Sequence, residues 1–230
     1  MSLCKCLRLY VNVFWHIKDA EYYTSWCKLE EIEIEISWIL KNQPTNAIDQ
    51  FIKFLQERVQ CWQSLYPYKV FISPEIKEGR RICNICGLDD TPWSSCHHIP
   101  GKIYCGVMCV RIVKDVELLG VAITENPVQK YSVLGVVDDD TEKSKESYEL
   151  IKKIFEHIHD PFEVWALRWS RKRHPHSFFK EFDSAGLCPC GSGVVYANCC
   201  LRTNGVLRPH VDIIFAERDQ APDVGAYVGY

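Results

Sequence analysis

Apolar side chains recur with helical spacing along the first quarter of the chain. Residues 21–41 contain neither proline nor glycine, and every third or fourth position is apolar: Leu29, Ile32, Ile36 and Ile39. The alternating run EIEIEIS in this segment also fits a strand, but the length of the segment and its Glu and Lys content favour a helix. Residues 1–16 fit either a helix or a strand.

A second apolar stripe predicts a helix after the break at residues 42–46, where Pro44 interrupts the pattern. Thr45 is a suitable N-cap, because its hydroxyl can accept a hydrogen bond from a backbone N–H of the first helical turn. The two helices are expected to form a hairpin. The stripe comprises Ile48, Ile52, Leu55, Val59 and Trp62.

The pattern changes to strands in the middle of the chain. Runs rich in Val, Ile and Leu occupy residues 107–113, 118–123 and 131–137, and turn-like residues separate them. Residues 69–73 predict a short extended piece, followed by a polar connector that ends at residue 81. These runs predict one small antiparallel sheet.

Helical spacing returns at residues 144–159, after a charged break at residues 138–142 that we interpret as a linker. Asp160-Pro161 predicts the start of a further helix, with Trp165 and Trp169 on its inner face and with phenylalanines beyond its end that anchor the C-terminal knuckle: Phe178, Phe179 and Phe182. The run from His210 to residue 216 predicts a strand, and the middle sheet is a candidate partner for it. We expect His210 to be structural rather than catalytic.

Together these elements predict an α+β fold in four parts. Residues 1–79 form a helical N-terminal region, and residues 80–137 form a small antiparallel β domain that carries cysteines. Residues 138–183 form a helical connector, and residues 184–230 form a cysteine-rich knuckle followed by a strand.

The composition is that of an ordinary globular protein. The chain has 230 residues, of which 47% are hydrophobic and 25% charged, and its net charge of −3 gives no strong field that would attract nucleic acid. The apolar run at residues 9–15 is too short to span a membrane and has no cleavage site. Thirteen cysteines, an odd number with CxxC and CxC spacings, indicate reduced thiols and metal binding rather than a disulfide framework. We therefore expect a cytoplasmic protein that contacts no membrane.

Four of these cysteines lie within thirteen residues at the spacing C-x-C-x8-C-C: Cys188, Cys190, Cys199 and Cys200. Zn²⁺ prefers four ligands in a tetrahedron, and thiolates supply them at about 2.3 Å. Gly191 and Gly193 allow the backbone to turn its N–H groups towards the sulfurs. We therefore predict one zinc ion here, whose binding is coupled to local folding; disulfides or free thiols are the alternative.

The run CPCGSG, followed by Tyr196 and the closing Cys199-Cys200, resembles the SEC-C motif. This motif is the zinc-binding tail of the protein-translocase motor and of many small bacterial proteins, so the resemblance implies a zinc knuckle with the same four cysteines as ligands. The family usually has lysines between GSG and the tyrosine, where this chain has Val194 and Val195. The two valines suggest a face that packs against the body of this protein itself.

A second metal-ligand pattern lies in the middle of the chain. A CxxC knuckle followed by glycine, and a C-x-H pair ten residues later, can supply four ligands to a second zinc ion: Cys83, Cys86, Cys96 and His98. Cys109 competes for the fourth position, and we interpret His97 as a bystander. The alternative for His98 is an ordinary surface or core imidazole.

This middle pattern has its own, weaker resemblance. The spacing of Cys96, His98, Gly101, Tyr104, Gly106 and Cys109, followed by Asn126-Pro127, is similar to a small zinc-bearing β segment of some phage and bacterial proteins. The match extends over residues 83–137 and implies no activity. Cys105 replaces an acidic residue of that segment, and it either packs or joins the metal.

Residues 168–180 form a basic and aromatic patch. Such residues can contact phosphates and stack on bases, which makes nucleic acid a candidate partner, or they can form the solvated C-terminal end of a helix. The candidate contacts are Arg168, Arg171, Lys172 and Arg173.

Two sites with four protein ligands each are closed to water, so they predict structural rather than catalytic zinc. We therefore expect a bacterial or phage adaptor that binds another protein and is not an enzyme. One alternative is an HNH-like nuclease, since CxxC with His97-His98 resembles its site; that fold requires a helix where residues 101–113 read as strand. The other alternative is a nucleic-acid-binding regulator that uses the basic patch.

Overall fold

The computed structural model describes residues 3–42, 50–135 and 147–216. The chain divides into two compact units, residues 1–148 and residues 149–230, and each is described by itself. Within the described residues, each unit combines α-helix with two-stranded antiparallel sheets, so the predicted α+β class is confirmed. The finer division into four parts stays a prediction.

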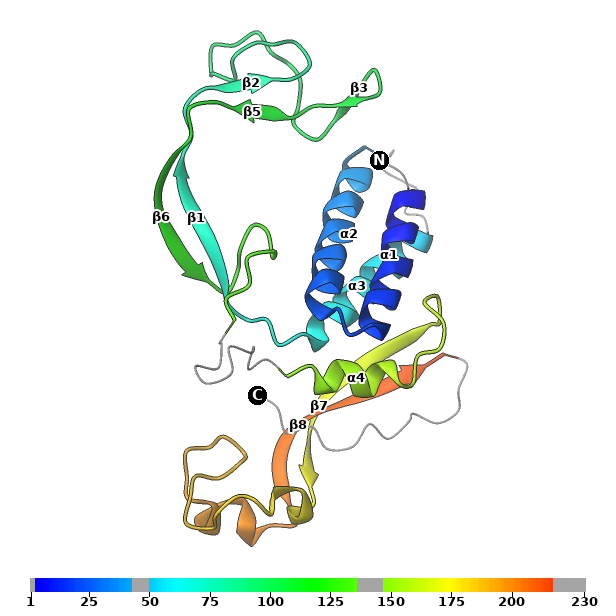
Figure 1. Cartoon of the computed structure of the whole chain (residues 1–230), viewed down its shortest axis with the longest axis vertical. Coiled ribbons are helices and arrows are strands. Elements are labelled where there is room, and N and C mark those ends of the chain that lie inside the picture. The colour runs from blue at the N-terminus through cyan, green and yellow to red at the C-terminus, as the bar shows by residue number, and fades with distance from the viewer. Residues whose placement is uncertain (1–2, 43–49, 136–146, 217–230) are drawn as a thin grey trace. The chain divides into compact units, whose positions relative to one another are not determined.

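Three helices form the N-terminal half of the first unit: α1 (Leu3–Lys18), α2 (Tyr22–Asn42) and α3 (Gln50–Leu65) (Figure 1). The ambiguous start of the chain is helical, and its buried side chains follow a helical spacing: Cys6, Leu9, Tyr10, Val13, Phe14 and Ile17. The segment with the alternating EIEIEIS run is also helical, because its buried residues lie three or four apart rather than two.

The predicted apolar stripe of α3 forms the core with α1 and α2. Ile52, Leu55, Val59 and Trp62 are each no more than 2% exposed. Thr45 and Ile48, the predicted cap and the first residue of the stripe, lie outside the described residues.

Aromatic residues close one end of this helical core. The Trp26 ring lies 5.1 Å from that of Tyr66 and 5.0 Å from that of Tyr68, measured between centroids, and the Tyr66 hydroxyl is hydrogen-bonded to buried Ser25. Burial raises the pKa of Tyr66, because a phenolate would be costly there. The Trp26 indole nitrogen donates to the carbonyl oxygen of Lys130 at 2.6 Å, which fixes the loop after the last strand of this unit.

The described residues in the remainder of the first unit form three separate two-stranded sheets rather than the single sheet predicted (Figure 1). The strand β1 (Phe71–Lys77) pairs with β6 (Glu117–Thr124), β2 (Arg81–Cys83) with β5 (Arg111–Val113), and β3 (Ile103–Tyr104) with β4 (Val107–Met108).

Two of the predicted strand runs correspond to these strands. The run at 107–113 is divided between β4 and β5, and the run at 118–123 lies within β6. The extended piece predicted at 69–73 continues to Lys77, so the polar connector is shorter than expected. In the run at 131–137, Val133 forms one isolated bridge to Phe71, and residues 136 and 137 lie outside the described residues.

The second unit contains one helix, α4 (Glu149–Phe155), and a ten-residue hairpin of β7 (Trp165–His174) and β8 (Val206–Phe215) within its described residues. Two predictions were wrong here. Residues 165–174 form a strand and no helix, and β8 pairs with β7 instead of the middle sheet, in a register from Trp165–Phe215 to His174–Val206.

The Asp160-Pro161 signal marks a turn in this structure. The Asp160 carboxylate accepts a hydrogen bond from the backbone N–H of Phe162 at 2.8 Å, and Glu163 accepts one from the N–H of His159 at 3.1 Å. Asp and Pro stabilise turns as well as helix starts, so the local signal could not decide between them. Within the strand that follows, Trp165 is buried but Trp169 is 44% exposed.

Candidate metal centres

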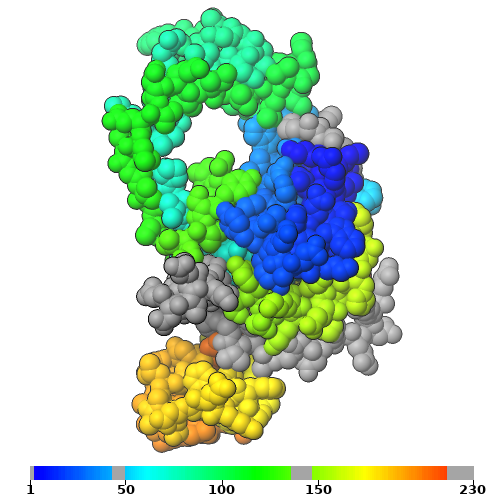
Figure 2. All heavy atoms as spheres, in the orientation of Figure 1, coloured from blue at the N-terminus to red at the C-terminus, as the bar shows by residue number. Residues whose placement is uncertain are grey.

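The four C-terminal cysteines converge in the loop between β7 and β8, which forms a rounded lobe coloured yellow to orange in Figure 2. The sulfurs of Cys188, Cys190, Cys199 and Cys200 all lie within 4.8 Å of one another. The Cys190–Cys199 and Cys199–Cys200 sulfur pairs are 3.6 and 3.9 Å apart. Four sulfurs bound at about 2.3 Å to one tetrahedral ion would stand about 3.8 Å apart. The donor set therefore fits zinc in both chemistry and spacing.

Local backbone structure brings these sulfurs together. The N–H of Cys188 donates to the carbonyl of Val194 at 2.8 Å, which closes a tight hairpin around the first two cysteines. Within this hairpin Gly191 and Gly193 have φ of 79° and 73°, a region that side chains disfavour, so the predicted positive φ of both glycines is confirmed. Two short 3-10 helices, η2 (Tyr196–Asn198) and η3 (Cys200–Arg202), place the last two cysteines.

A small apolar core supports this cysteine cluster. Phe179, at the end of the 3-10 helix η1 (His176–Phe179), packs with Tyr196 and Val206 against Cys188 and Cys200. Phe179 therefore has the anchoring role predicted for three phenylalanines, whereas Phe178 and Phe182 are 54% and 42% exposed.

Val194 and Val195 do not pack against the protein body as predicted. They are 45% and 36% exposed, because the hairpin that carries the cysteines turns these side chains outwards. Leu187, the bridge partner of Val195, is 68% exposed, and Leu201 is 44% exposed. The cysteine loop therefore exposes four aliphatic side chains.

The environment shifts the pKa values of Cys188 and Cys190 in opposite directions. Burial opposes ionisation of Cys190, but hydrogen bonds from the Ser192 hydroxyl and the neighbouring thiols outweigh it and lower its pKa to about 6. Burial raises the pKa of Cys188 to about 12, and the backbone N–H groups of Cys190 and Cys200 offset this only in part. A bound cation would favour the thiolate form of both residues.

The middle cluster also forms. The ligand atoms of Cys83, Cys86, Cys96 and His98 all lie within 4.8 Å of one another. The Cys86 and Cys96 sulfurs are 3.6 Å apart, and Nδ1 of His98 is 3.8 Å from the Cys96 sulfur. Cys83 ends β2, and its carbonyl accepts the N–H of Gly87 at 2.8 Å, which forms the predicted knuckle.

Three residues that sequence reasoning placed near this cluster lie outside the group of four. His97 and Cys105 are exposed, and Cys105 occupies the turn of the β3–β4 hairpin with φ of 50°. Cys109 is fully buried, and its sulfur is 3.8 Å from that of Cys83. It accepts a hydrogen bond from the Arg111 guanidinium at 3.1 Å.

Arg111 is a supporting residue that the sequence did not reveal. Its guanidinium also donates to the carbonyl of His98 at 2.7 Å and pairs with the carboxylate of Asp90 at 3.1 Å. It therefore connects Cys109 to the backbone of a candidate ligand residue. The only sequence signal for Arg111 was its position two residues after Cys109, which places both side chains on the same face of an extended strand.

The thiols of the middle cluster also differ in acidity. Burial disfavours the Cys83 thiolate, but backbone N–H groups of Cys86 and Ile85 outweigh it and lower the pKa of Cys83 to about 6. The backbone of His98 favours the Cys96 thiolate, yet burial and the neighbouring thiols still raise the pKa of Cys96. Burial, followed by the proximity of Cys83, raises the pKa of Cys109.

The candidate nucleic-acid residues lie on β7, and three of the four bond within the protein. Arg168 and Lys172 both reach the Asp212 carboxylate, at 3.3 and 2.9 Å, and Arg173 donates to Thr203 at 2.7 Å. Arg171 is exposed and makes no hydrogen bond or ion pair with the described residues.

Asp212 organises the polar side of the β7–β8 hairpin. Its carboxylate also lies 2.9 Å from Nε2 of His210, which is 9% exposed. The Lys172 hydrogen bond is the main cause that lowers the pKa of Asp212 to about 2; burial opposes it, and His210 and Arg168 add to it. Sequence reasoning missed Asp212, because Arg168 and Lys172 reach its carboxylate only when the strands pair.

Comparison with protein families agrees with this geometry. The family model of the SEC-C motif matches residues 187–202. The chain carries a SEC-C motif. Comparison of the whole chain with curated proteins and with solved structures finds no match. None of the helices in the described segments is both long and apolar enough to cross a membrane.

Proposed function

We propose that this SEC-C protein holds two structural zinc ions and acts by binding another protein. The observation that carries the proposal is that each cluster brings four ligand atoms within 4.8 Å of one another. Four protein ligands complete the tetrahedral shell of zinc and leave no position for a water nucleophile. Sets rich in soft thiolates favour zinc over magnesium or calcium.

The proposed contact surface is the apolar rim of the SEC-C loop, formed by Leu187, Val194, Val195 and Leu201. All four side chains are at least 36% exposed although they lie within or beside the metal loop. Apolar side chains gathered on a rigid element are a common feature of protein-binding surfaces. Because valines replace the usual lysines, we expect an apolar contact that responds weakly to salt.

The metal sites can be tested by elemental analysis of protein purified with reductant. We expect two zinc equivalents per chain, falling to one in Cys188→Ser and to one in Cys83→Ser. Cys105→Ser is the matched control, since this exposed thiol lies outside both groups, and it should retain two equivalents. Wild-type protein that contains no zinc, or whose cluster sulfurs are joined as disulfides, would disprove the proposal.

The contact surface can be tested by quantitative affinity capture with the zinc-loaded protein. The wild type should retain its partner between 0.1 and 0.5 M salt, a range in which the screening length falls from about 10 to about 4 Å. A Val194→Lys/Val195→Lys variant should bind two zinc ions normally but lose the partner. Equal capture by both proteins would exclude this rim as the contact surface.

The two alternatives are less well supported. Between His98 and residue 135, the described residues form strands and loops and no helix that an HNH-type site would need. A nucleic-acid role is weakened because Arg168 and Lys172 are engaged by Asp212. We therefore retain protein binding as the proposed function.

A further inference from the structure

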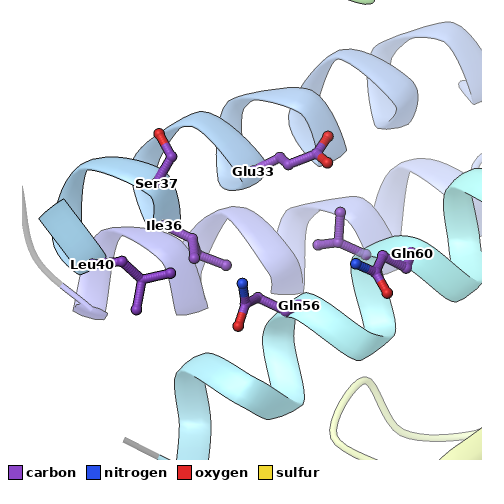
Figure 3. A pocket seen from close by; sticks show the side chains of 7 residues that line it. Glu33, Ile36, Ser37, Leu40, Gln56 and Gln60 are labelled. Carbon is purple, nitrogen blue, oxygen red and sulfur yellow. The ribbon is translucent and has the colours of Figure 1, made fainter. Parts of the chain in front are cut away.

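A hollow lies between α2 and α3, in the first unit. Figure 3 shows Ile36 and Leu40 pointing from α2 towards α3, with Gln56 and Gln60 across from them. Ile36 and Val59 are 3% and 2% exposed and form an apolar floor, whereas Gln56 and Gln60 stand at the rim. The hollow has a volume of about 180 Å³.

This volume suits one side chain of a partner rather than a complete small molecule. Small-molecule sites usually have volumes of about 300–1,000 Å³. Leu40, 37% exposed, extends the apolar lining, so an aliphatic side chain that enters would be buried on several sides. Burial of a leucine-sized side chain contributes about 1.5–3 kcal/mol.

The two carboxamides at the rim have the spacing of an extended peptide. Gln56 and Gln60 are one helical turn apart, and four residues of α-helix rise about 6 Å. Every second residue of an extended chain presents its backbone groups on the same side, at a repeat of about 6.6 Å. A carboxamide both donates and accepts, so each can bond one N–H and one C=O of a peptide backbone. Neither the Gln56 carboxamide nor the Gln60 carboxamide makes a hydrogen bond with the described residues.

The hollow continues into a second one along the same helices, and Glu33 and Gln60 line both. At this junction the Glu33 carboxylate pairs with Lys130 at 2.5 Å, which also lies 3.8 Å from Glu30, and it accepts a hydrogen bond from Gln63 at 3.1 Å. The first hollow therefore presents amides and aliphatic groups, and the carboxylate that lines it, that of Glu33, is ion-paired. This chemistry favours an uncharged, extended segment over a charged ligand.

We propose that the α2–α3 groove binds an extended peptide segment of a partner protein. One aliphatic side chain of the segment occupies the hollow between Ile36, Leu40 and Val59, and the backbone on either side of it bonds to Gln56 and Gln60. The site is separate from both metal clusters, so it does not depend on the proposed zinc-dependent function.

The test uses a phage-displayed library of random linear twelve-residue peptides, selected on the full-length zinc-loaded protein. Selected peptides are expected to share one aliphatic residue with little constraint elsewhere. Fluorescein-labelled synthetic copies should bind, by fluorescence anisotropy, at least tenfold more weakly to a Gln56→Ala/Gln60→Ala variant. Methylation of the peptide nitrogens that flank the aliphatic residue should weaken binding similarly, because it removes backbone donors.

Two variants provide the controls. Ser37→Trp places a large side chain at an exposed position of the rim and should abolish binding, whereas Gln50→Ala, at an exposed position of α3 outside the hollow, should leave it unchanged. Circular dichroism verifies that each variant is folded. The proposal is overturned if no peptide is enriched, if Ser37→Trp binds as well as the wild type, or if the wild type forms a dimer that Ser37→Trp prevents.

Discussion

Arg111 donates a hydrogen bond to the sulfur of Cys109 at 3.1 Å, although neither residue belongs to the four-ligand group beside them. The same guanidinium bonds to the carbonyl of His98. Cys109 is therefore a supporting thiol in this geometry, and Arg111 positions the backbone of a candidate ligand.

This relationship predicts that substitutions of Cys109 and of Cys96 have different effects on zinc binding. Cys109→Ser should retain the second zinc equivalent, whereas Cys96→Ser should lose it, as measured by elemental analysis. Arg111→Ala should weaken zinc binding at this cluster by about 10–100-fold, the usual effect of removing a residue that orients a ligand, measured by competition with a chromogenic chelator. Loss of zinc in Cys109→Ser with retention in His98→Ala would instead show that Cys109 is the fourth ligand.

A second prediction concerns the core under the SEC-C loop. Phe179→Ala removes a ring that is 2% exposed and should lower the free energy of unfolding by about 3–5 kcal/mol, with a parallel loss of zinc affinity, because folding and metal binding are coupled there. Phe178→Ala, one residue away and 54% exposed, is the matched control. Thermal unfolding measures the change in stability, and a zinc titration measures the change in affinity. Equal effects of the two substitutions would contradict the assignment of Phe179 as the supporting side chain.

Asp212 gives a prediction with a defined pH dependence. Its pKa is lowered to about 2 in the folded protein, so its stabilising effect is complete above the unfolded pKa of 3.8 and is lost as the pH falls towards 2. Asp212→Asn should therefore destabilise the protein by about 1–2 kcal/mol at pH 7, in urea unfolding experiments. A double-mutant cycle with Lys172→Ala should show coupling, and additive effects would mean that the pair contributes nothing.

The basic strand yields a prediction for nucleic acid. Because Arg168 and Lys172 are engaged by Asp212, we expect a 20-base-pair DNA duplex to bind weakly, with a shallow dependence on salt. Arg171→Glu should have little effect in an anisotropy titration between 50 and 200 mM salt. Tight binding that is lost in Arg171→Glu would instead support the nucleic-acid regulator.

Local patterns predicted the parts of the structure that depend on near neighbours. The stripe of α3, with Leu55 and Trp62, predicted a buried helical face, and the spacing of Cys188 and Cys190 predicted a knuckle. These features follow from side-chain period or from a few consecutive backbone angles. In each case the residues that decide the conformation lie within one or two turns of one another.

The strand β7 could not be predicted in this way. Its partner β8 follows more than thirty residues later in the chain, so Trp165 and its neighbours gave no local indication of the ten-residue pairing. The exposure of Val194 was misjudged for a related reason, since the direction of an apolar side chain on a short hairpin depends on how the four cysteines converge. Asp212 and Arg111 likewise acquire their neighbours only in the folded chain.

The pairing of His174 with Val206 has a consequence for how such proteins arise. These two residues are the last of β7 and the first of β8, so the entire cysteine loop begins and ends at adjacent positions, about 5 Å apart. A loop with closely spaced ends can be transplanted into other antiparallel hairpins without disturbing their strands. We therefore expect that the whole loop between these residues, and not the shorter SEC-C segment alone, could be moved into another antiparallel hairpin.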